Sequence, residues 1–245
     1  MTKRVALVTG STAGIGEGIA EFLAKEGWRV VVSGRREQEG NMIVDRIRSN
    51  GGEAIFIAAD LSNQDSIKEL HEKAIAVWGR IDGAVNNAGI NTDQHKFAEL
   101  SDEEFQKMIQ VNILGVFRCM QLQIKHMLPY KSGSIVNIAS TAGQRSTILS
   151  GTYSATKHAV IGLTKTAGVE YAAEGICVNA VAPGCVKTQF LQQALSSGWS
   201  EESISDLFPI KRLSEPKDIA RAVSFLLNSP YAVGSVVTVD GGHCA

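Results

Sequence analysis

Short β-branched segments alternate with longer helical segments along this chain, and the alternation restricts its fold more than any other feature. The runs Val5–Val8 and Val30–Val32 are continuously apolar. Such runs are typical of strands that are buried on both faces of a parallel sheet. The alternation therefore predicts an α/β fold: a doubly wound parallel sheet with right-handed crossovers and helices on both faces. Because no linker or repeat interrupts the pattern, we expect a single domain over residues 1–245.

The expected elements follow one another without long gaps except in one place. The expected strands are Val5–Thr9, Arg29–Ser33, Ala54–Ala58, Gly83–Asn87, Ser134–Ile138, Cys177–Ala182 and Ser235–Val239. The expected helices are Gly16–Glu26, Gln38–Ser49, Gln64–Val77, Asp102–Met120, Thr152–Ala173 and Lys217–Leu227. The irregular insertion at residues 186–213 is expected to form a lid over the carboxyl ends of the strands, with a disordered loop as the alternative.

The composition is ordinary for a globular protein and excludes several classes of partner. Hydrophobic residues make up 44% of the chain, charged residues 20%, and the formal net charge is −1. This balance gives no electrostatic basis for binding nucleic acid or an anionic membrane. The run Val5–Val8 is too short for a signal peptide or a membrane span. The four cysteines lack metal-binding spacing, so we expect free thiols, no metal and a cytoplasmic location.

A glycine-rich turn, Thr9–Gly16, connects the first expected strand to the first helix. Its glycines, in the spacing G-xxx-G-x-G, allow positive φ angles and close approach of a pyrophosphate to the backbone. The N–H groups at the start of the following helix can bind phosphate. The turn therefore indicates a dinucleotide site, with a glycine-rich turn that binds no ligand as the alternative.

Tyr153 and Lys157 are separated by one helical turn, and Ser140 precedes the tyrosine by thirteen residues. On a helix, side chains at i and i+4 share one face. A phenol with its usual pKa of about 10 is a poor acid or base at neutral pH. A nearby ammonium favours the phenolate and lowers that pKa, and a serine hydroxyl could bind the oxygen whose charge changes. Such a pair also occurs by chance on many helices, so it depends on the other motifs.

The order of the motifs resembles the short-chain dehydrogenase/reductase family, in its compact single-domain branch, over essentially the whole chain. The matching motifs are Thr9–Gly16, Asp60, Asn86–Gly89, Asn112, Ser140, Tyr153 with Lys157, and Pro183-Gly184. The resemblance implies a Rossmann-type fold and nicotinamide-dependent interconversion of a ketone and a secondary alcohol by hydride transfer.

The resemblance also implies roles for four residues near the reacting atoms. Tyr153 would be the general acid/base, and Ser140 would orient the substrate oxygen. Lys157 would tune Tyr153 and bind the nicotinamide ribose, while Asn112 would support a proton-relay water. The alternatives are that Asn112 faces solvent or bonds the preceding helical turn, and that Ser140 is a cap or turn residue.

The resemblance further implies a set of cofactor contacts, among which Asp60 meets the adenine and Thr188 reaches the nicotinamide carboxamide. The set is Gly10, Ser11, Thr12, Gly14, Ile15, Gly16, Arg35, Arg36, Asp60, Leu61, Asn87, Ala88, Gly89, Tyr153, Lys157, Pro183, Gly184, Val186 and Thr188. The alternatives are that Asp60 and Thr188 cap helices, and that Asn86–Gly89 mainly brace the central sheet.

The end of the second strand favours NADP(H) over NAD(H). A carboxylate there would bond the ribose 2′-hydroxyl and repel a 2′-phosphate, but this position is Gly34. Arg35 and Arg36 follow, and a guanidinium suits phosphate binding. The alternative is that both arginines are solvated charges. The first glycine loop has Ala13 where NADP-preferring relatives often have a basic residue, which makes the predicted preference weaker.

The expected substrate is a small carbonyl compound or alcohol. Alternatives are an NAD-dependent secondary-alcohol dehydrogenase, a beta-ketoacyl-carrier-protein reductase and a non-catalytic dinucleotide-binding sensor. Glu174 stands where such carrier-protein reductases often have a basic residue, which argues against that role. Apolar residues of the insertion either form a substrate wall or pack the lid onto the core; they are Phe190, Leu191, Leu195, Trp199, Leu207 and Phe208.

Two helices predict self-association. The segments Asp102–Met120 and Thr152–Ala173 carry apolar residues on more than one face, among them Val111, Leu114, Val116, Phe117, Val160, Leu163 and Val169. In the family, these two helices pair across a two-fold axis, so a homotetramer of D₂ symmetry, or at least a dimer, is expected. The tail Val236–Ala245 is expected to reach a neighbouring subunit.

Overall fold

A computed structural model of the chain describes residues 3–93, 95–188, 191, 195 and 198–245. Its centre is a seven-stranded sheet in the order β3-β2-β1-β4-β5-β6-β7, in which every neighbouring pair is parallel. The strands are β1 (Val5–Thr9), β2 (Arg29–Gly34), β3 (Glu53–Ala58), β4 (Gly83–Asn86), β5 (Gly133–Ile138), β6 (Ile176–Pro183) and β7 (Val236–Val239). The predicted doubly wound sheet is confirmed.

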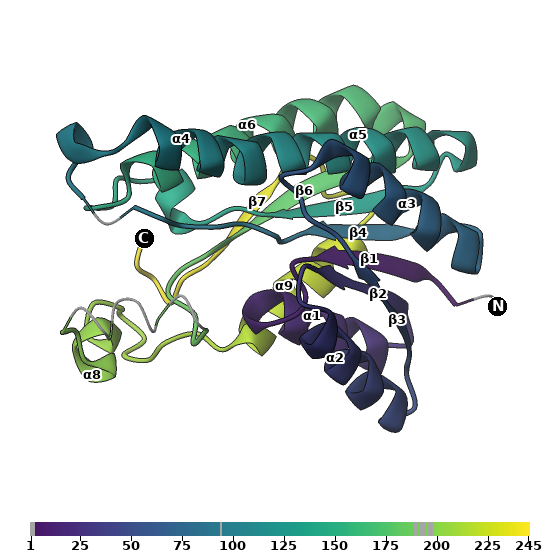
Figure 1. The fold of residues 1–245 in the computed structure, drawn as a ribbon, viewed down its shortest axis with the longest axis horizontal. Helices are drawn as coiled ribbons and strands as arrows, with labels where there is room; N and C mark the ends of the chain where they lie inside the picture. Colours follow the sequence, from purple (N-terminus) through teal and green to yellow (C-terminus); the bar gives the residue numbers. More distant parts are fainter. Residues whose placement is uncertain (1–2, 94, 189–190, 192–194, 196–197) are drawn as a thin grey trace.

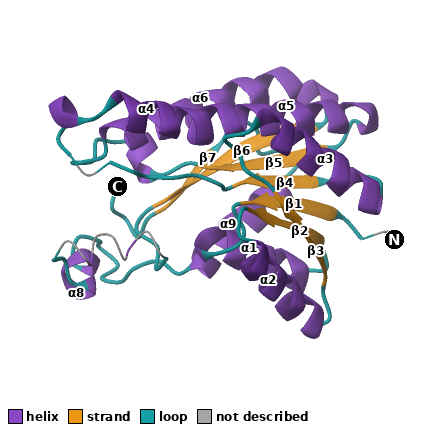
Figure 2. Cartoon of the chain, in the orientation of Figure 1, coloured by secondary structure: helices purple, strands orange, loops and turns teal. Residues whose placement is uncertain are grey.

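Helices cover both faces of the sheet (Figure 1, Figure 2). One face carries α1 (Gly14–Lys25), α2 (Glu37–Ser49) and α9 (Pro216–Leu227). The other face carries α3 (Gln64–Trp78), α4 (Asp102–Met108), α5 (Val116–Met127) and α6 (Gly151–Tyr171). The short helix α8 (Glu201–Ser205) lies apart from both layers, beyond one end of the sheet.

Alternating side chains of the central strands supply the two cores. Ala6 and Val8 of β1 pack with α1 and α9, whereas Val5 and Leu7 pack toward α5 and α6. All four are at most 1% exposed, which is why β1 reads as a continuous apolar run. Burial of a valine or leucine side chain contributes about 1.5–3 kcal/mol to the free energy of unfolding.

The predicted helix over Asp102–Met120 is interrupted in the structure. α4 ends at Met108, a π-helical segment η2 occupies Ile109–Gly115, and α5 continues to Met127. A β-carbon at Gly115 would lie 2.9 Å from the main-chain oxygen of Leu61, so the helix can approach that loop only with glycine there. π-helical turns often occur at functional sites, and this one carries Asn112.

The described part of the insertion contains the short helix α8 and a buried apolar cluster of its own. Leu191, Ile204, Phe208 and Leu213 form one buried cluster, while Trp199 and Leu207 are about half exposed. Packing within the insertion therefore accounts for Leu191 and Phe208. Phe190 lies outside the described residues. The role of the insertion as a lid stays a prediction.

From β1 the chain continues outward in one direction through β2 and β3, and from β4 it continues in the other direction through β5, β6 and β7. The carboxyl ends of β1 and β4 therefore lie at the point where the strand order reverses. Ligands of open α/β sheets bind outside the strand ends at such a point. Within the part of the chain that the structure describes, no helix is long and apolar enough to cross a lipid bilayer.

Candidate active site

The glycine turn forms an open cradle between β1 and α1. Gly10 and Gly14 have φ angles of 63° and 60°, which side-chain-bearing residues rarely adopt. A β-carbon at Gly10 would lie 2.7 Å from Cα of Ala88. α1 begins after Ala13, which has no side-chain oxygen to cap the first N–H groups. These residues fit a dinucleotide, because the backbone is accessible and the helix N-terminus favours a pyrophosphate.

Side chains brace this cradle from the neighbouring strands. Ser11 Oγ donates to the Val8 oxygen at 2.7 Å and accepts from the Ser33 amide at 2.9 Å. Asn87 Nδ2 donates to the main-chain oxygens of Thr9 and Gly10, at 3.0 and 2.9 Å. The Ser11 hydroxyl and the Asn87 amide therefore hold the loop itself.

Thr9, which was not predicted as a site residue, completes the brace: its Oγ1 accepts from the main-chain amides of Asn87 and Ala88. At Gly16, a side chain would collide with Asn87 Nδ2 and the Gly10 oxygen. Ile15 is partly buried and packs against the core. The contacts support the bracing interpretation of the Asn86–Gly89 segment.

Asn86 belongs to a buried polar network behind the site. It exchanges hydrogen bonds with Gln123 at 3.0 and 2.9 Å and donates to Asn137 Oδ1 at 2.8 Å. Asn137 in turn donates to Thr164 Oγ1 at 2.9 Å. The network joins β4 and β5 to α5 and α6, and satisfied buried networks of this kind fix one arrangement of a core.

Two arginines follow the end of β2, beside the glycine cradle. Arg36 donates to Oγ1 and to the main-chain oxygen of Thr12, at 3.2–3.3 Å. Arg35 is exposed and lies close enough to Asp60 to lower its pKa. Gly34 is buried, and a β-carbon there would lie 2.8 Å from Thr12 Cγ2. The end of β2 is therefore followed by two positively charged residues, Arg35 and Arg36, and its last residue, Gly34, has no side chain.

Asp60 stabilises the turn that follows β3. Burial raises the pKa of its carboxyl group, but two hydrogen bonds from Ser62 and the charge of Arg35 outweigh this, so the pKa is lowered overall. The N-cap of α3 is Asn63, so Asp60 does not cap that helix. Leu61 is buried.

The first turn of α6 meets the end of β5 at the centre of the site. Tyr153 and Ser140 are joined by a side-chain hydrogen bond, and Ser140 Oγ also accepts from the Ala142 amide at 3.1 Å. Lys157 is buried; its Nζ donates to the Ile138 oxygen at 2.8 Å and lies 5.5 Å from the Tyr153 ring centroid. The structure thus brings the three predicted residues together.

The pKa of Tyr153 is not lowered, although the sequence led us to expect that it would be. Burial raises the pKa of Tyr153 to about 12, although the hydrogen bond with Ser140 acts in the lowering direction. Burial also lowers the pKa of Lys157 to about 8. The expectation that Lys157 lowers the pKa of the phenol is therefore not met, because burial dominates both groups and disfavours both charged forms.

Asn112 is buried and does not face solvent. Its Oδ1 accepts from the Ile90 amide and its Nδ2 donates to the Ile90 oxygen, each at 2.8 Å. Nδ2 also donates to Thr156 Oγ1 at 3.1 Å, and Thr156 Oγ1 donates to the main-chain oxygen of Tyr153 at 2.8 Å. A side chain at Gly89 would contact both Asn112 and Lys157. Asn112 thus ties the loop after β4 to α6, while its relay role stays a prediction.

The segment after β6 passes close to the glycine cradle. β6 ends at Pro183, and the Gly184 amide donates to the Val239 oxygen at 3.0 Å. Val186 is buried and bridges to Ser214. A β-carbon at Gly14 would lie 3.1 Å from Thr188 Cγ2. Thr188 therefore lies over the glycine loop, as a residue in contact with a bound dinucleotide would.

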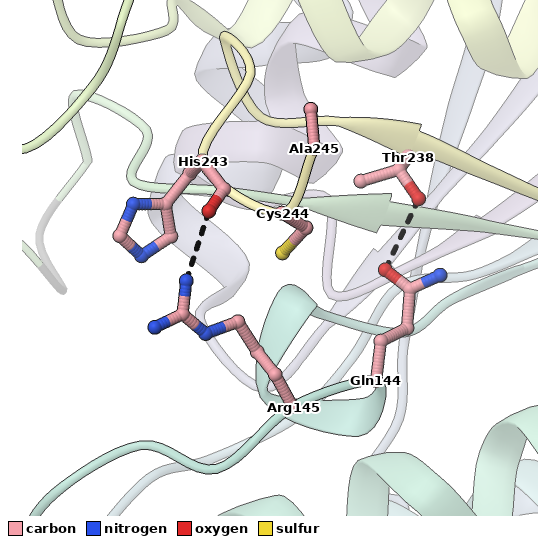
Figure 3. A pocket seen from close by; sticks show the side chains of 6 residues that line it. All are labelled: Gln144, Arg145, Thr238, His243, Cys244 and Ala245. Carbon is pink, nitrogen blue, oxygen red and sulfur yellow. Dashed lines mark hydrogen bonds between the residues drawn. The ribbon is translucent and has the colours of Figure 1, made fainter.

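The C-terminal tail lies against the segment that follows Ser140 (Figure 3). Arg145 Nη1 donates to the His243 oxygen at 2.9 Å, and Thr238 Oγ1 donates to Gln144 Oε1 at 3.1 Å. These residues, with Cys244 and Ala245, line a surface cleft of about 430 Å³. The His243 ring lies 4.8 Å from the ring of Phe208, so the tail connects the insertion after β6 to the loop after Ser140 within one subunit.

A glycine cradle at the switch point of a parallel sheet, next to a Ser–Tyr–Lys group, defines a dinucleotide-dependent oxidoreductase. The family model described as short chain dehydrogenase matches residues 4–197. The chain therefore belongs to the short-chain dehydrogenase/reductase family, and it is an oxidoreductase of that family.

Individual relatives span nearly the whole chain. A 3-oxoacyl-[acyl-carrier-protein] reductase of Synechocystis sp. is 39% identical over 99% of this chain and 97% of the relative. A 2,5-dichloro-2,5-cyclohexadiene-1,4-diol dehydrogenase of Sphingobium indicum is 36% identical over 100% of this chain and 98% of the relative. The crystal structure of an actinorhodin polyketide ketoreductase variant with NADPH is 36% identical and covers 98% of this chain and 97% of its own, with a TM-score of 0.94.

Proposed function

We propose that this chain uses NADPH to reduce the ketone group of a small apolar compound to a secondary alcohol. The proposal rests on one observation: the side chains of Ser140, Tyr153 and Lys157 lie together in the structure. NADPH bound at the cradle would supply a hydride to the carbonyl carbon. Tyr153 gives its hydroxyl proton to the carbonyl oxygen, and Ser140 donates a hydrogen bond to that oxygen as charge develops on it. Lys157 holds positive charge beside the tyrosine.

The strand end at Gly34 supports NADPH as the cofactor. The Arg36 guanidinium contacts Thr12 of the cradle, and Arg35 is exposed and acts on Asp60. No carboxylate at position 34 opposes a 2′-phosphate. The related ketoreductase structure was solved with NADPH.

Exposed apolar side chains support an apolar substrate. Phe97 is 82% exposed and lies against Gly151, two residues before Tyr153 in the chain. Ile148, in the loop before α6, is 88% exposed. Side chains of this kind near a catalytic residue suit a hydrophobic or aromatic ketone.

The test is a comparison of NADPH oxidation rates with cyclic ketones, aromatic ketones, diketones and short acyl thioesters. We expect turnover of at least one apolar ketone, and a lower kcat/KM with NADH than with NADPH. Oxidation of secondary alcohols by NAD⁺ alone, without ketone reduction by NADPH, would contradict the proposal and favour the dehydrogenase alternative.

A beta-ketoacyl-carrier-protein reductase is the second candidate, favoured by the 39% identity to a 3-oxoacyl-[acyl-carrier-protein] reductase. Glu174 is exposed beyond the end of α6, and a carboxylate there repels an acidic carrier. Equal kcat/KM for a free beta-ketoacyl thioester and the same acyl group on a carrier protein would exclude specific carrier recognition. A strong preference for the carrier-bound form would establish it.

We further propose that the protein is a homotetramer, or at least a dimer, assembled through α5 and α6. Phe117 and Val169 on these helices are 39% and 75% exposed, although Val116 and Val160 are buried toward the sheet. Light scattering at micromolar concentration is expected to give four times the chain mass, or at least twice that mass. The double variant Phe117→Glu with Val169→Glu is expected to give smaller species. The double variant Met42→Glu with Tyr231→Glu, at exposed positions outside α5 and α6, is the control. A monomeric parent would contradict the prediction.

A further inference from the structure

The helix that carries Tyr153 begins without a cap from its own segment. Ser150 is the N-cap residue of α6 and makes no side-chain capping hydrogen bond. The preceding Leu149 has a φ angle of 55°, a left-handed conformation that is unfavourable for leucine. Tyr153 is the third residue of the helix, so its amide is one of the groups that a capping side chain normally satisfies.

Asp93, from a different part of the chain, accepts the hydrogen bond that a capping side chain would otherwise accept. Its Oδ2 accepts from the Tyr153 amide at 2.8 Å, across sixty residues of sequence. Its own amide is held by Asn91 Oδ1 at 3.0 Å, which fixes the aspartate in its turn. A carboxylate at a helix N-terminus also interacts favourably with the helix dipole.

The position of Asp93 in the loop gives this bond a functional meaning. The loop starts at β4, where Asn87 holds the glycine cradle. It continues through Ile90, which exchanges two hydrogen bonds with Asn112, and reaches the catalytic helix at Asp93. Phe97, a little further along, packs against Gly151 of the same helix. One loop therefore connects the dinucleotide cradle to the main chain of the acid/base.

The arrangement also has an energetic cost. Asp93 Oδ1 is enclosed and has no hydrogen-bond partner among the described residues. An enclosed carboxylate oxygen without a partner lowers stability. Asp93 therefore combines a bond that holds the Tyr153 main chain with an oxygen that has no partner among the described residues.

We propose that Asp93 is a positioning residue, which holds the main chain of Tyr153 so that its hydroxyl stays at Ser140 and at the substrate oxygen. The expected effect on turnover rests on the proposed function, whereas the hydrogen bond itself does not. Displacement of a reacting group by about 1 Å can cost about 10²-fold in rate, so loss of the bond affects kcat more than cofactor binding.

The experiment compares Asp93→Ala and Asp93→Asn in the full chain, with Asp45→Asn on the exposed side of α2 as the matched control. Asp93→Ala is expected to lower kcat by about 10- to 100-fold, with a dissociation constant for NADPH within about threefold of the parent. Asp93→Asn keeps an acceptor oxygen and is expected to recover most of the turnover. The control is expected to match the parent.

Hydrogen exchange of the peptide around Gly151–Ser154 gives a readout that does not depend on activity. We expect faster exchange in Asp93→Ala, and near-parent exchange in Asp93→Asn, at a temperature where circular dichroism shows all variants folded. Exchange and kcat both unchanged in Asp93→Ala would overturn the proposal, as would faster exchange with unchanged kcat. If the parent reduces no ketone, the proposed function fails, and unchanged exchange would then overturn the positioning bond separately.

Discussion

Replacement of Tyr153 by phenylalanine is expected to lower kcat for ketone reduction by about 10²–10⁴-fold, the usual contribution of a positioned acid or base. The substitution removes the hydroxyl that bonds Ser140 and leaves the ring in place. Because the glycine cradle and Arg35 are untouched, the dissociation constant for NADPH should stay close to the parent value. Steady-state kinetics with the best ketone, together with a fluorescence titration of NADPH, measure both quantities.

Tyr231→Phe is the matched control, since Tyr231 is fully exposed and follows α9. It should leave kcat and the NADPH dissociation constant unchanged. If Tyr153→Phe keeps kcat within a few-fold of the parent, Tyr153 is not the acid/base, and the mechanism has to be assigned to other residues.

The pH dependence of reduction is expected to follow Lys157. Tyr153, with a pKa of about 12, keeps its proton throughout the neutral range. Lys157, with a pKa of about 8, loses its charge as the pH rises through that value. We therefore expect kcat for reduction to be level below about pH 7 and to fall above pH 8. A kcat that is level up to pH 10 would show that the charge of Lys157 does not matter for this step.

The sequence predicted the sheet well because its signals are local. Val5–Val8 and Val30–Val32 are apolar on both faces, and the structure buries them on both faces. The interruption of the helix at Ile109–Gly115 was not predicted. At its end, Gly115 approaches the main-chain oxygen of Leu61 so closely that a β-carbon would lie 2.9 Å from it. That contact joins parts of the chain far apart in sequence, and no pattern of neighbouring residues records it.

The candidate site was predictable where a motif has a fixed spacing. Ser140, Tyr153 and Lys157 were predicted in this way, and the structure brings the three residues together, while their catalytic roles stay predictions. Thr9, Thr156 and Asp93 were not found, since each acts through a hydrogen bond to the main chain of a distant segment. Asp93 follows Gly89 by only four residues, but nothing in that segment indicates that its partner is the amide of Tyr153.

Replacement of Arg35 by alanine is expected to weaken NADPH binding by one to two powers of ten and to leave NADH binding almost unchanged. A charge-assisted hydrogen bond to the 2′-phosphate contributes about 1.5–3 kcal/mol, and NADH lacks that phosphate. Dissociation constants for both cofactors, measured at one salt concentration, test this. Arg221→Ala, an exposed arginine on α9, is the control for a general loss of positive charge. A parent that binds NADH more tightly than NADPH would contradict the assignment of the cofactor.

Full reversal of the preference is expected to need a carboxylate at position 34 as well as the loss of Arg35, because repulsion must replace attraction. Gly34→Asp alone meets an obstacle, since its β-carbon would lie 2.8 Å from Thr12 Cγ2 and 3.0 Å from Thr12 Oγ1. Thr12→Ala removes both atoms and leaves the next contact, Cβ of residue 12, at 3.5 Å. We therefore expect Thr12→Ala with Gly34→Asp and Arg35→Ala to prefer NADH.

Thr12→Ala alone separates the steric effect from the electrostatic one. It removes the Oγ1 acceptor of Arg36 but leaves the main-chain oxygen of Thr12, to which Arg36 also donates. This single variant should still prefer NADPH, while Gly34→Asp without it should bind both cofactors poorly because the crowded residue 34 displaces the glycine loop. If the triple variant still prefers NADPH, then Arg36 alone supplies the phosphate contact, and Arg36→Ala in that background should complete the reversal.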